Sequence, residues 1–129
     1  MAEPKLLQLA HELEWLGVEL EYVGQKHAHE GFPNAGATWA EFLVKQRGVL
    51  VTADKIEREL KSAVRFNPTS LVGVEFPLEE TLDSVTTLLT AVEQIKQTAV
   101  MAVHNLPTKV RAFTRMVNTY LETVAEVSG

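Results

Sequence analysis

The sequence predicts an all-α protein, an antiparallel four-helix bundle formed by a single domain over residues 1–129. First, apolar residues recur at alternating steps of three and four in four stretches, a spacing that places them on one face of an α-helix. Second, glycine and proline interrupt this pattern between the stretches, where connections are expected. Third, 129 residues, 46% of them hydrophobic, are enough to bury a core without disulfides, and the chain has no cysteine.

The first helix has the clearest pattern, a heptad seam of Leu6, Leu9, Leu13, Leu16, Leu20 and Val23. Small residues repeat beside this seam every seven positions, at Ala10, Gly17 and Gly24. Glycine inside a helix costs about 1 kcal/mol relative to alanine, so we expect a second helix to pack closely there. A second apolar strip lies on another face and consists of Trp15, Val18 and Tyr22. Either another helix of the chain covers this strip, or a partner does.

Residues 27–36 are predicted to form a loop, and Thr38 with Glu41 to form the capping box of a second helix. The seam of this helix contains Trp39, Phe42, Gln46, Val49, Ala53, Ile56, Leu60 and Ala63. Three apolar residues that favour strands follow Gly48, so we expect a kink near this glycine. The alternative is an α+β fold in which a small hairpin pairs residues 49–52 with residues 71–76.

Two prolines exclude a helix through residues 67–77, and Pro77 suits the first turn of a third helix. Its expected seam contains Leu82, Val85, Leu89, Val92, Ile95, Ala99 and Val103. A short break at 104–107 precedes a fourth helix with a seam of Val110, Phe113, Val117, Tyr120, Val124 and Val127. In an up-down bundle, this break and the loop at 27–36 lie at the same end.

The net charge of −5 is unevenly distributed. Residues 1–36 and 67–105 each sum to −4, whereas residues 37–66 sum to +2 and residues 106–129 to +1, so antiparallel neighbours are expected to attract. Lys109 and Arg111 lie in the first turns of the fourth helix and Glu122 and Glu126 in its last, which opposes the helix dipole, so we expect acidic residues of neighbouring helices to pair with the two cations. The longest uncharged run has twelve residues, and the start of the chain does not resemble a secretory signal. We therefore expect a cytoplasmic protein.

Four residues form a candidate metal site: His27, His29, Glu30 and His104. Imidazole and carboxylate groups bind zinc and other transition metals, and the predicted topology brings these residues to one end of the bundle. Their spacing matches no known metal-binding motif on a helix. The histidines are therefore also consistent with ordinary solvated loop residues, and no cofactor is expected, with a divalent metal as the alternative.

Acidic pairs suggest a second chemistry, a metal- or nucleotide-dependent hydrolase of the all-α type. The pair Glu80-x-x-Asp83 resembles half of the acidic signature of the nucleotide pyrophosphohydrolases similar to MazG, which hold magnesium with paired carboxylates on two helices. The other half of that signature, Glu-x-x-Glu on an earlier helix, is not met. The nearest stretch is Asp54-x-x-Glu57, which has aspartate where the family pattern has glutamate.

The third possibility is a small nucleic-acid-associated subunit. Arg58, Lys61 and Arg65 share one helix face, as a phosphate-binding surface requires. The acidic balance of the whole chain argues against this function.

The sequence favours a non-enzymatic protein-interaction module, such as a small subunit, an adaptor or a chaperone-like protein. The first helix has more apolar surface than one bundle seam needs, and tryptophan and tyrosine are common anchors at protein interfaces. We therefore predict self-association through Trp15, Val18 and Tyr22, with Arg111 and Arg115 as a secondary polar patch. No catalytic residues are predicted, and neither a membrane nor a nucleic acid is the expected partner.

Overall fold

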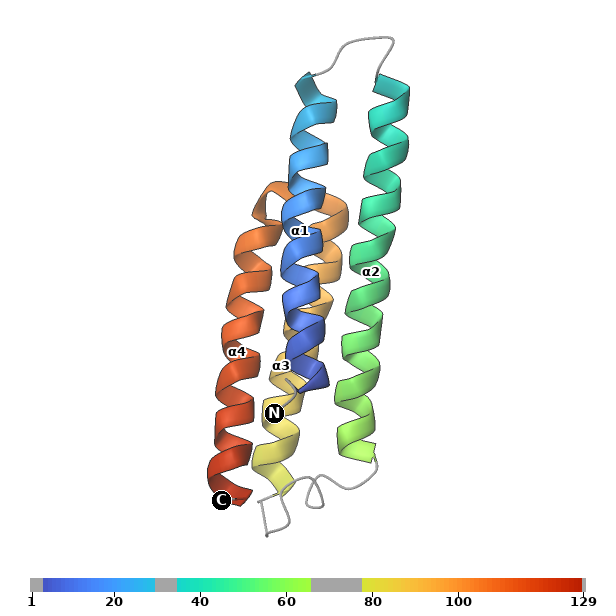
Figure 1. Cartoon of the computed structure of the whole chain (residues 1–129). Helices are drawn as coiled ribbons and strands as arrows, with labels where there is room; N and C mark the ends of the chain where they lie inside the picture. Colours follow the sequence, from blue (N-terminus) through green and yellow to red (C-terminus); the bar gives the residue numbers. More distant parts are fainter. Residues whose placement is uncertain (1–3, 30–34, 66–77, 129) are drawn as a thin grey trace.

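The computed structural model is an all-α four-helix bundle, as the sequence predicts (Figure 1). It describes residues 4–29, 35–65 and 78–128, and the side chains of these except at 29, 35, 63–65, 78–83 and 123–128. The elements are α1 (Lys5–His29), α2 (Ala35–Arg65), α3 (Leu78–Met101), a short 3-10 turn η1 (Val103–Asn105) and α4 (Leu106–Ser128). The described residues contain no strand, and none of their helices is long and apolar enough to cross a membrane.

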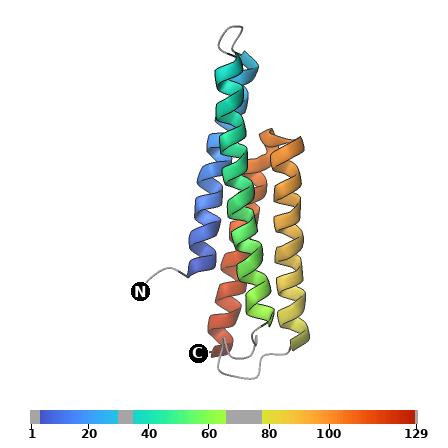
Figure 2. The ribbon, with the colours of Figure 1, turned by 90° about the vertical axis from the view of Figure 1, so that its right-hand side faces the viewer.

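The helices form a square in which α1 packs against α2 and α4, and α3 packs against the same two helices. α1 and α3 are therefore diagonal neighbours. The α1–α2 connection and η1 lie at the same end of the bundle, as expected (Figure 1). The α1–α2 pair also projects well beyond η1 (Figure 2), and we call this projecting part the hairpin extension.

The apolar seams meet in one continuous core. The largest side chains in it that are fully buried are Leu13, Leu20, Ile56, Leu60, Leu88, Ile95, Leu106 and Phe113. The predicted seams of α1 and α4 are confirmed wherever their side chains are described. On α3, the core position is Leu88, and Leu89 is only partly buried, so the predicted stripe was displaced by one residue at that turn.

The small residues of α1 lie where neighbouring helices approach, which confirms the prediction. Ala10 is fully buried. A Cβ atom added at Gly17 would lie 3.5 Å from Cγ of Leu106, and one added at Gly24 would lie 3.4 Å from Cε2 of Phe42. Gly17 and Gly24 therefore lie at the contacts of α1 with α4 and with α2, at distances that would still accommodate a methyl group.

Two predicted helix ends and one predicted cap were wrong, because helical packing continues further than glycine and proline suggest. α1 continues through His27 to His29, and α2 already begins at Ala35. Thr38 is therefore not a cap. It lies inside α2, is buried, and its hydroxyl is 2.9 Å from Nδ1 of His27.

The expected kink and the alternative strand are likewise not found in α2. This helix runs through Gly48 without interruption, and Val49, Thr52, Ala53 and Ile56 are buried at helical spacing. Residues 49–52 are therefore helical, and the proposed partner segment 71–76 lies outside the described residues.

Trp39 was expected in the core but is 48% exposed. It lies on the hairpin extension, and the seam of α2 continues there beyond the end of α3 (Figure 2). Its ring stacks on Phe42, with ring centroids 5.4 Å apart and planes 12° apart. The periodic pattern therefore correctly predicts a helix, but the neighbour that would cover Trp39 is missing at this level.

We predict that Gly17→Ala stabilises the protein. The added methyl group would make only ordinary van der Waals contacts, at 3.5 Å from Leu106 and 3.7 Å from Val110. The gain in helix propensity should raise the free energy of unfolding, measured by urea denaturation, by about 0.5–1 kcal/mol. Gly48→Ala is the matched control, because its only close neighbour is the flexible end of Leu16, at 3.8 Å. A destabilised Gly17→Ala beside a stabilised Gly48→Ala would contradict the spacing of α1 and α4.

Candidate functional site

The aromatic strip of α1 is exposed and is not covered by another described helix. The side chain of Trp15 is 66% exposed and that of Tyr22 67%, and Val18 between them is exposed as well. The seam residues Leu13 and Leu20 lie on the opposite side of the helix and are fully buried. The chain therefore does not use this strip in its own core, and the first of the two possibilities, coverage by another described helix, does not hold.

Two valines of α2 extend this apolar surface, and sequence analysis missed them. Val44 is 70% exposed, and Val51 is exposed as well. Val44 and Val51 each lie about one helical turn from Gly48, on the same side of α2. A Cβ atom built at Gly48 would face Leu16 of α1, so this side of α2 borders α1. Because both valines are exposed, they lie beside α1 on the solvent side. Their spacing of seven residues, outside the main seam, is a signal that could have identified them. We call Trp15, Val18, Tyr22, Val44 and Val51 the outer face.

One ion pair joins the two halves of the outer face. Nζ of Lys45 donates a hydrogen bond to Oε2 of Glu19, at 2.9 Å. Glu19 is one helical turn from Trp15 and three residues from Tyr22, so the pair lies between the apolar residues of α1 and those of α2. The hydrogen bond from Lys45 to Glu19 raises the pKa of Lys45, and the two charges neutralise each other.

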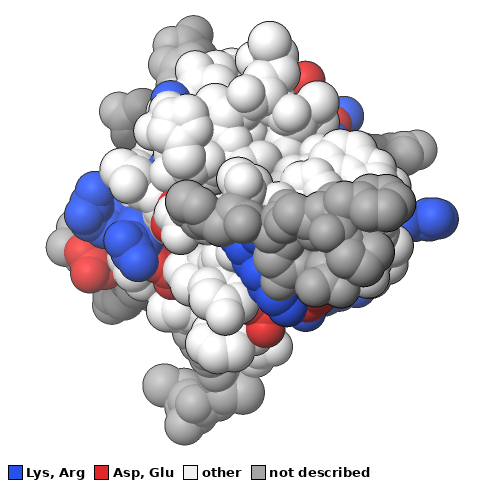
Figure 3. All heavy atoms as spheres, turned by 90° about the horizontal axis from the view of Figure 1, so that it is seen from above, with Lys and Arg blue, Asp and Glu red and all other residues white. Residues whose placement is uncertain are grey.

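The basic residues of α4 are not paired as predicted. Within the part of the chain that the structure describes, Lys109, Arg111 and Arg115 form no ion pair. Seen from the end that carries η1, much of the surface is uncharged, and basic side chains appear at several places around it (Figure 3). Arg115 also lines a cavity between α3 and α4, away from the outer face of α1 and α2.

The candidate metal residues lie in different surroundings. His27 is hydrogen-bonded to Thr38 and packs beside Trp39, with ring centroids 5.4 Å apart. His104 lines a cavity of about 280 Å³ together with Glu21, Gly24 and Met101. Glu30 lies outside the described residues, as does the side chain of His29. No group of three potential metal ligands is found among the described residues.

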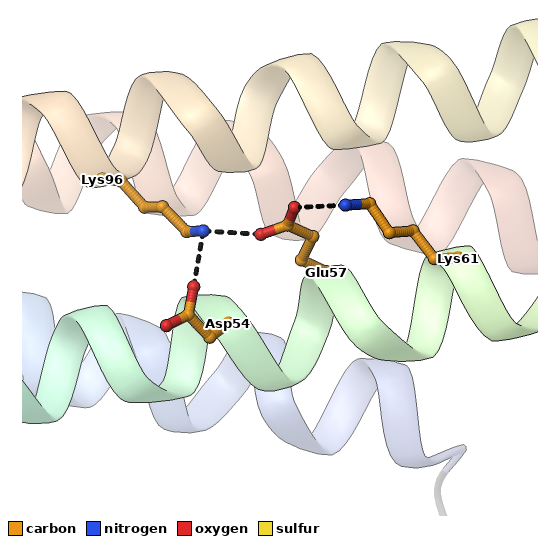
Figure 4. Close-up of polar contacts among 4 residues, drawn as sticks. All are labelled: Asp54, Glu57, Lys61 and Lys96. Atoms are coloured by element: carbon orange, nitrogen blue, oxygen red, sulfur yellow. Dashed lines mark hydrogen bonds and ion pairs between the residues drawn. The ribbon is translucent and has the colours of Figure 1, made fainter.

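Asp54 and Glu57, the nearest match to the first acidic pair, are bound by lysines (Figure 4). Nζ of Lys96 on α3 lies 2.5 Å from Oδ1 of Asp54 and 2.5 Å from Oε2 of Glu57. Lys61 binds the other oxygen of Glu57 at 2.7 Å. We call these four residues the lysine clasp. It joins α2 to α3, and it occupies the carboxylates that a magnesium ion would need. The side chains of Glu80 and Asp83 are not among those described.

The contacts within the clasp shift the pKa values of Glu57 and Lys96. Hydrogen bonds from Lys61 and then from Lys96 lower the pKa of Glu57 to about 2. For Lys96, burial lowers the pKa, but the hydrogen bonds to Asp54 and Glu57 outweigh it, so the net shift is upward. Glu57 and Lys96 are therefore both charged at neutral pH.

The predicted basic face of α2 is only partly described. Arg58 is exposed, Lys61 belongs to the clasp, and the side chain of Arg65 lies outside the described set. Its role in nucleic-acid binding stays a prediction.

Comparison with known proteins adds no assignment to this geometry. No family model matches the chain, and neither a curated protein nor a solved structure is significantly similar to it.

We predict that the lysine clasp contributes stability that is lost in acid. Because the pKa of Glu57 is lowered from 4.5 to about 2, its contribution is present above pH 4.5 and disappears as the pH falls towards 2. Glu57→Gln should reduce the free energy of unfolding by about 1 kcal/mol at neutral pH, a value discounted for partial solvent exposure. This difference from the wild type should vanish near pH 2 in urea denaturation.

The control for this experiment is Glu93→Gln, which removes an exposed glutamate of α3 that has no ion pair in the described part of the chain. It should change stability little at any pH. A Glu57→Gln difference that stays constant between neutral pH and pH 2 would argue against the clasp as a source of acid sensitivity.

Proposed function

We propose that this protein is a non-enzymatic helical interaction module that self-associates through the outer face. The observation that carries this proposal is the exposure of Trp15 and Tyr22, two large aromatic side chains on a helix whose other faces are already packed. Contiguous apolar surface of this kind marks association sites in soluble proteins, and aromatic residues are the usual anchors of such sites.

The charge of the outer face supports a second copy as the partner. The chain is acidic, with a net charge of −5, so two copies that met through most other surfaces would repel each other. The outer face carries the ion pair of Glu19 and Lys45, and the nearby Glu41 also acts on Lys45. Two copies related by a twofold axis would bury Trp15, Tyr22, Val44 and Val51 against each other and could leave this ion pair intact.

The rigidity of the surface also suits a binding role. Both helices that carry the outer face are anchored by fully buried residues directly behind it, Leu13 and Leu20 on α1 and Val49 on α2. The backbone beneath the face is therefore held in place before binding, which reduces the entropic cost of association. A small subunit or adaptor in the cytoplasm is the role we infer.

We predict that the double variant Trp15→Glu and Tyr22→Glu dissociates the oligomer. Two acidic groups on each copy would be buried against the same groups of the other copy, at a cost that an apolar interface does not offset. Multi-angle light scattering should show a mass that falls to that of the single chain, 14.3 kDa. Circular dichroism should show unchanged helix content, because both residues are exposed.

The matched control is Val100→Glu with Met101→Glu, which adds the same charge at two exposed apolar residues at the end of α3. This variant should keep the mass of the wild type. A wild-type mass of 14.3 kDa at high protein concentration, or equal dissociation in both double variants, would refute self-association through the outer face.

A further inference from the structure

A groove runs along the seam between α3 and α4. It consists of two adjoining cavities of about 420 and 320 Å³, which share Thr87 and Met116. Its α3 side extends from Ser84 to Gln94, which corresponds to about 15 Å of helix. Both volumes lie in the range of about 300–1,000 Å³ that is typical of small-molecule sites. Because α3 is diagonal to α1, this groove belongs to a different side of the bundle from the outer face.

The groove combines an apolar floor with polar walls. Leu88, Ala112 and Met116 contribute the apolar surface of the larger cavity. Hydroxyl groups line both sides, from Ser84 and Thr87 on α3 to Tyr120 on α4. Arg115 is the only charged residue among the described ones that line either cavity. The groove is therefore amphipathic, and its described lining carries one positive charge in an acidic protein.

Three polar groups on this groove have no protein partner among the described residues. They are the guanidinium group of Arg115 and the hydroxyl groups of Ser84 and Tyr120. Burial raises the pKa of Tyr120, so its phenol stays protonated and can donate a hydrogen bond at neutral pH. Elsewhere in the protein, Lys45 and Lys96 each form an ion pair with a nearby carboxylate, that of Glu19 and that of Glu57. An unpaired arginine at the edge of a groove instead leaves its charge available for an anion from outside.

We propose that the groove binds an amphiphile that carries one carboxylate or phosphate group on an apolar chain. The head group binds the guanidinium of Arg115, which holds carboxylate and phosphate oxygens through two parallel hydrogen bonds. The hydroxyls of Ser84 and Tyr120 donate further hydrogen bonds to the ligand. The apolar chain covers Leu88 and Met116 and follows the groove past Thr87 towards Gln94. This binding is independent of self-association through the outer face.

The test is isothermal titration calorimetry on the full chain with four probes. Decanoate and decyl phosphate carry both parts of the proposed ligand, decanol lacks the charge, and inorganic phosphate lacks the chain. We expect saturable binding of at least one of the two anionic amphiphiles, and weaker binding of decanol and of inorganic phosphate. The anionic amphiphile that binds more tightly identifies the head group as a carboxylate or a phosphate.

Variants separate specific binding from nonspecific adsorption. Arg115→Gln should weaken binding of the anionic amphiphile at least about tenfold, because it removes a charge-assisted hydrogen-bonded pair. Arg111→Gln is the matched control: it removes the same charge from an exposed residue of α4 that does not line the groove, and it should leave the affinity unchanged. Thr87→Leu places a larger side chain where the two cavities join, and it should block binding while circular dichroism shows an intact bundle.

Any one of four binding results would overturn the proposal, as would one further result with Thr87→Leu. The four binding results are the absence of binding for both anionic amphiphiles, equal affinity for decanol, equal affinity for inorganic phosphate, and an Arg115→Gln variant that binds as well as Arg111→Gln. Unchanged affinity in Thr87→Leu would also overturn it, because the ligand would then lie elsewhere.

Discussion

Burial of one apolar seam from each helix is the constraint on which the rest of the structure depends. Leu13, Ile56, Ile95 and Phe113 represent the four seams, and each of them is almost completely removed from solvent. Removing apolar surface from water is the main favourable contribution to folding, about 25 cal/mol per Å². Each helix can turn only one face to this shared core. An apolar residue on any other face therefore stays outside, which is why the outer face is exposed.

Polar contacts adjust this arrangement locally. The alternation of acidic and basic segments correctly suggests attraction between α1 and α2, where Glu19 meets Lys45. Between α2 and α3, however, the lysine clasp works in the opposite sense, since its central cation, Lys96, belongs to the acidic segment and its carboxylates belong to the basic one. Ion pairs need groups within about 4 Å of each other. Facing positions therefore decide which charges pair, and the summed charge of a segment does not.

The sequence predicted the helices better than their surroundings. Periodicity gives the face of each helix directly, so Leu9, Leu20 and Val117 could be assigned to the core from spacing alone. The exposure of Trp39 could not be predicted in this way, because it depends on α3 ending below that level. The predicted kink at Gly48 and the predicted cap at Thr38 failed for a related reason. Packing along the whole of α2 outweighs the local preferences of these two residues.

The candidate sites also differ in whether the sequence alone could reveal them: a site on one helix could be found, and a site between two helices could not. The aromatic strip was visible in the sequence because Trp15, Val18 and Tyr22 repeat on one helix. Val44 and Val51 join it only once α2 is placed beside α1, and the α3–α4 groove exists only between two helices. That Arg115 has no partner among the described residues likewise depends on its neighbours in space, which spacing along the chain does not give.

The hairpin extension divides the molecule into parts of unequal cooperativity. Its turns of α1 and α2 have one neighbouring helix each, whereas the turns around Val92 and Val110 have two and lie in the shared core (Figure 2). Opening the extension breaks the stack of Trp39 on Phe42 and the bond of His27 to Thr38, but it leaves that core closed. We therefore expect amide hydrogens of the extension to exchange through a local opening that needs less free energy than global unfolding. The four-helix core and the hairpin extension should thus open as separate cooperative units, the extension at the lower free energy.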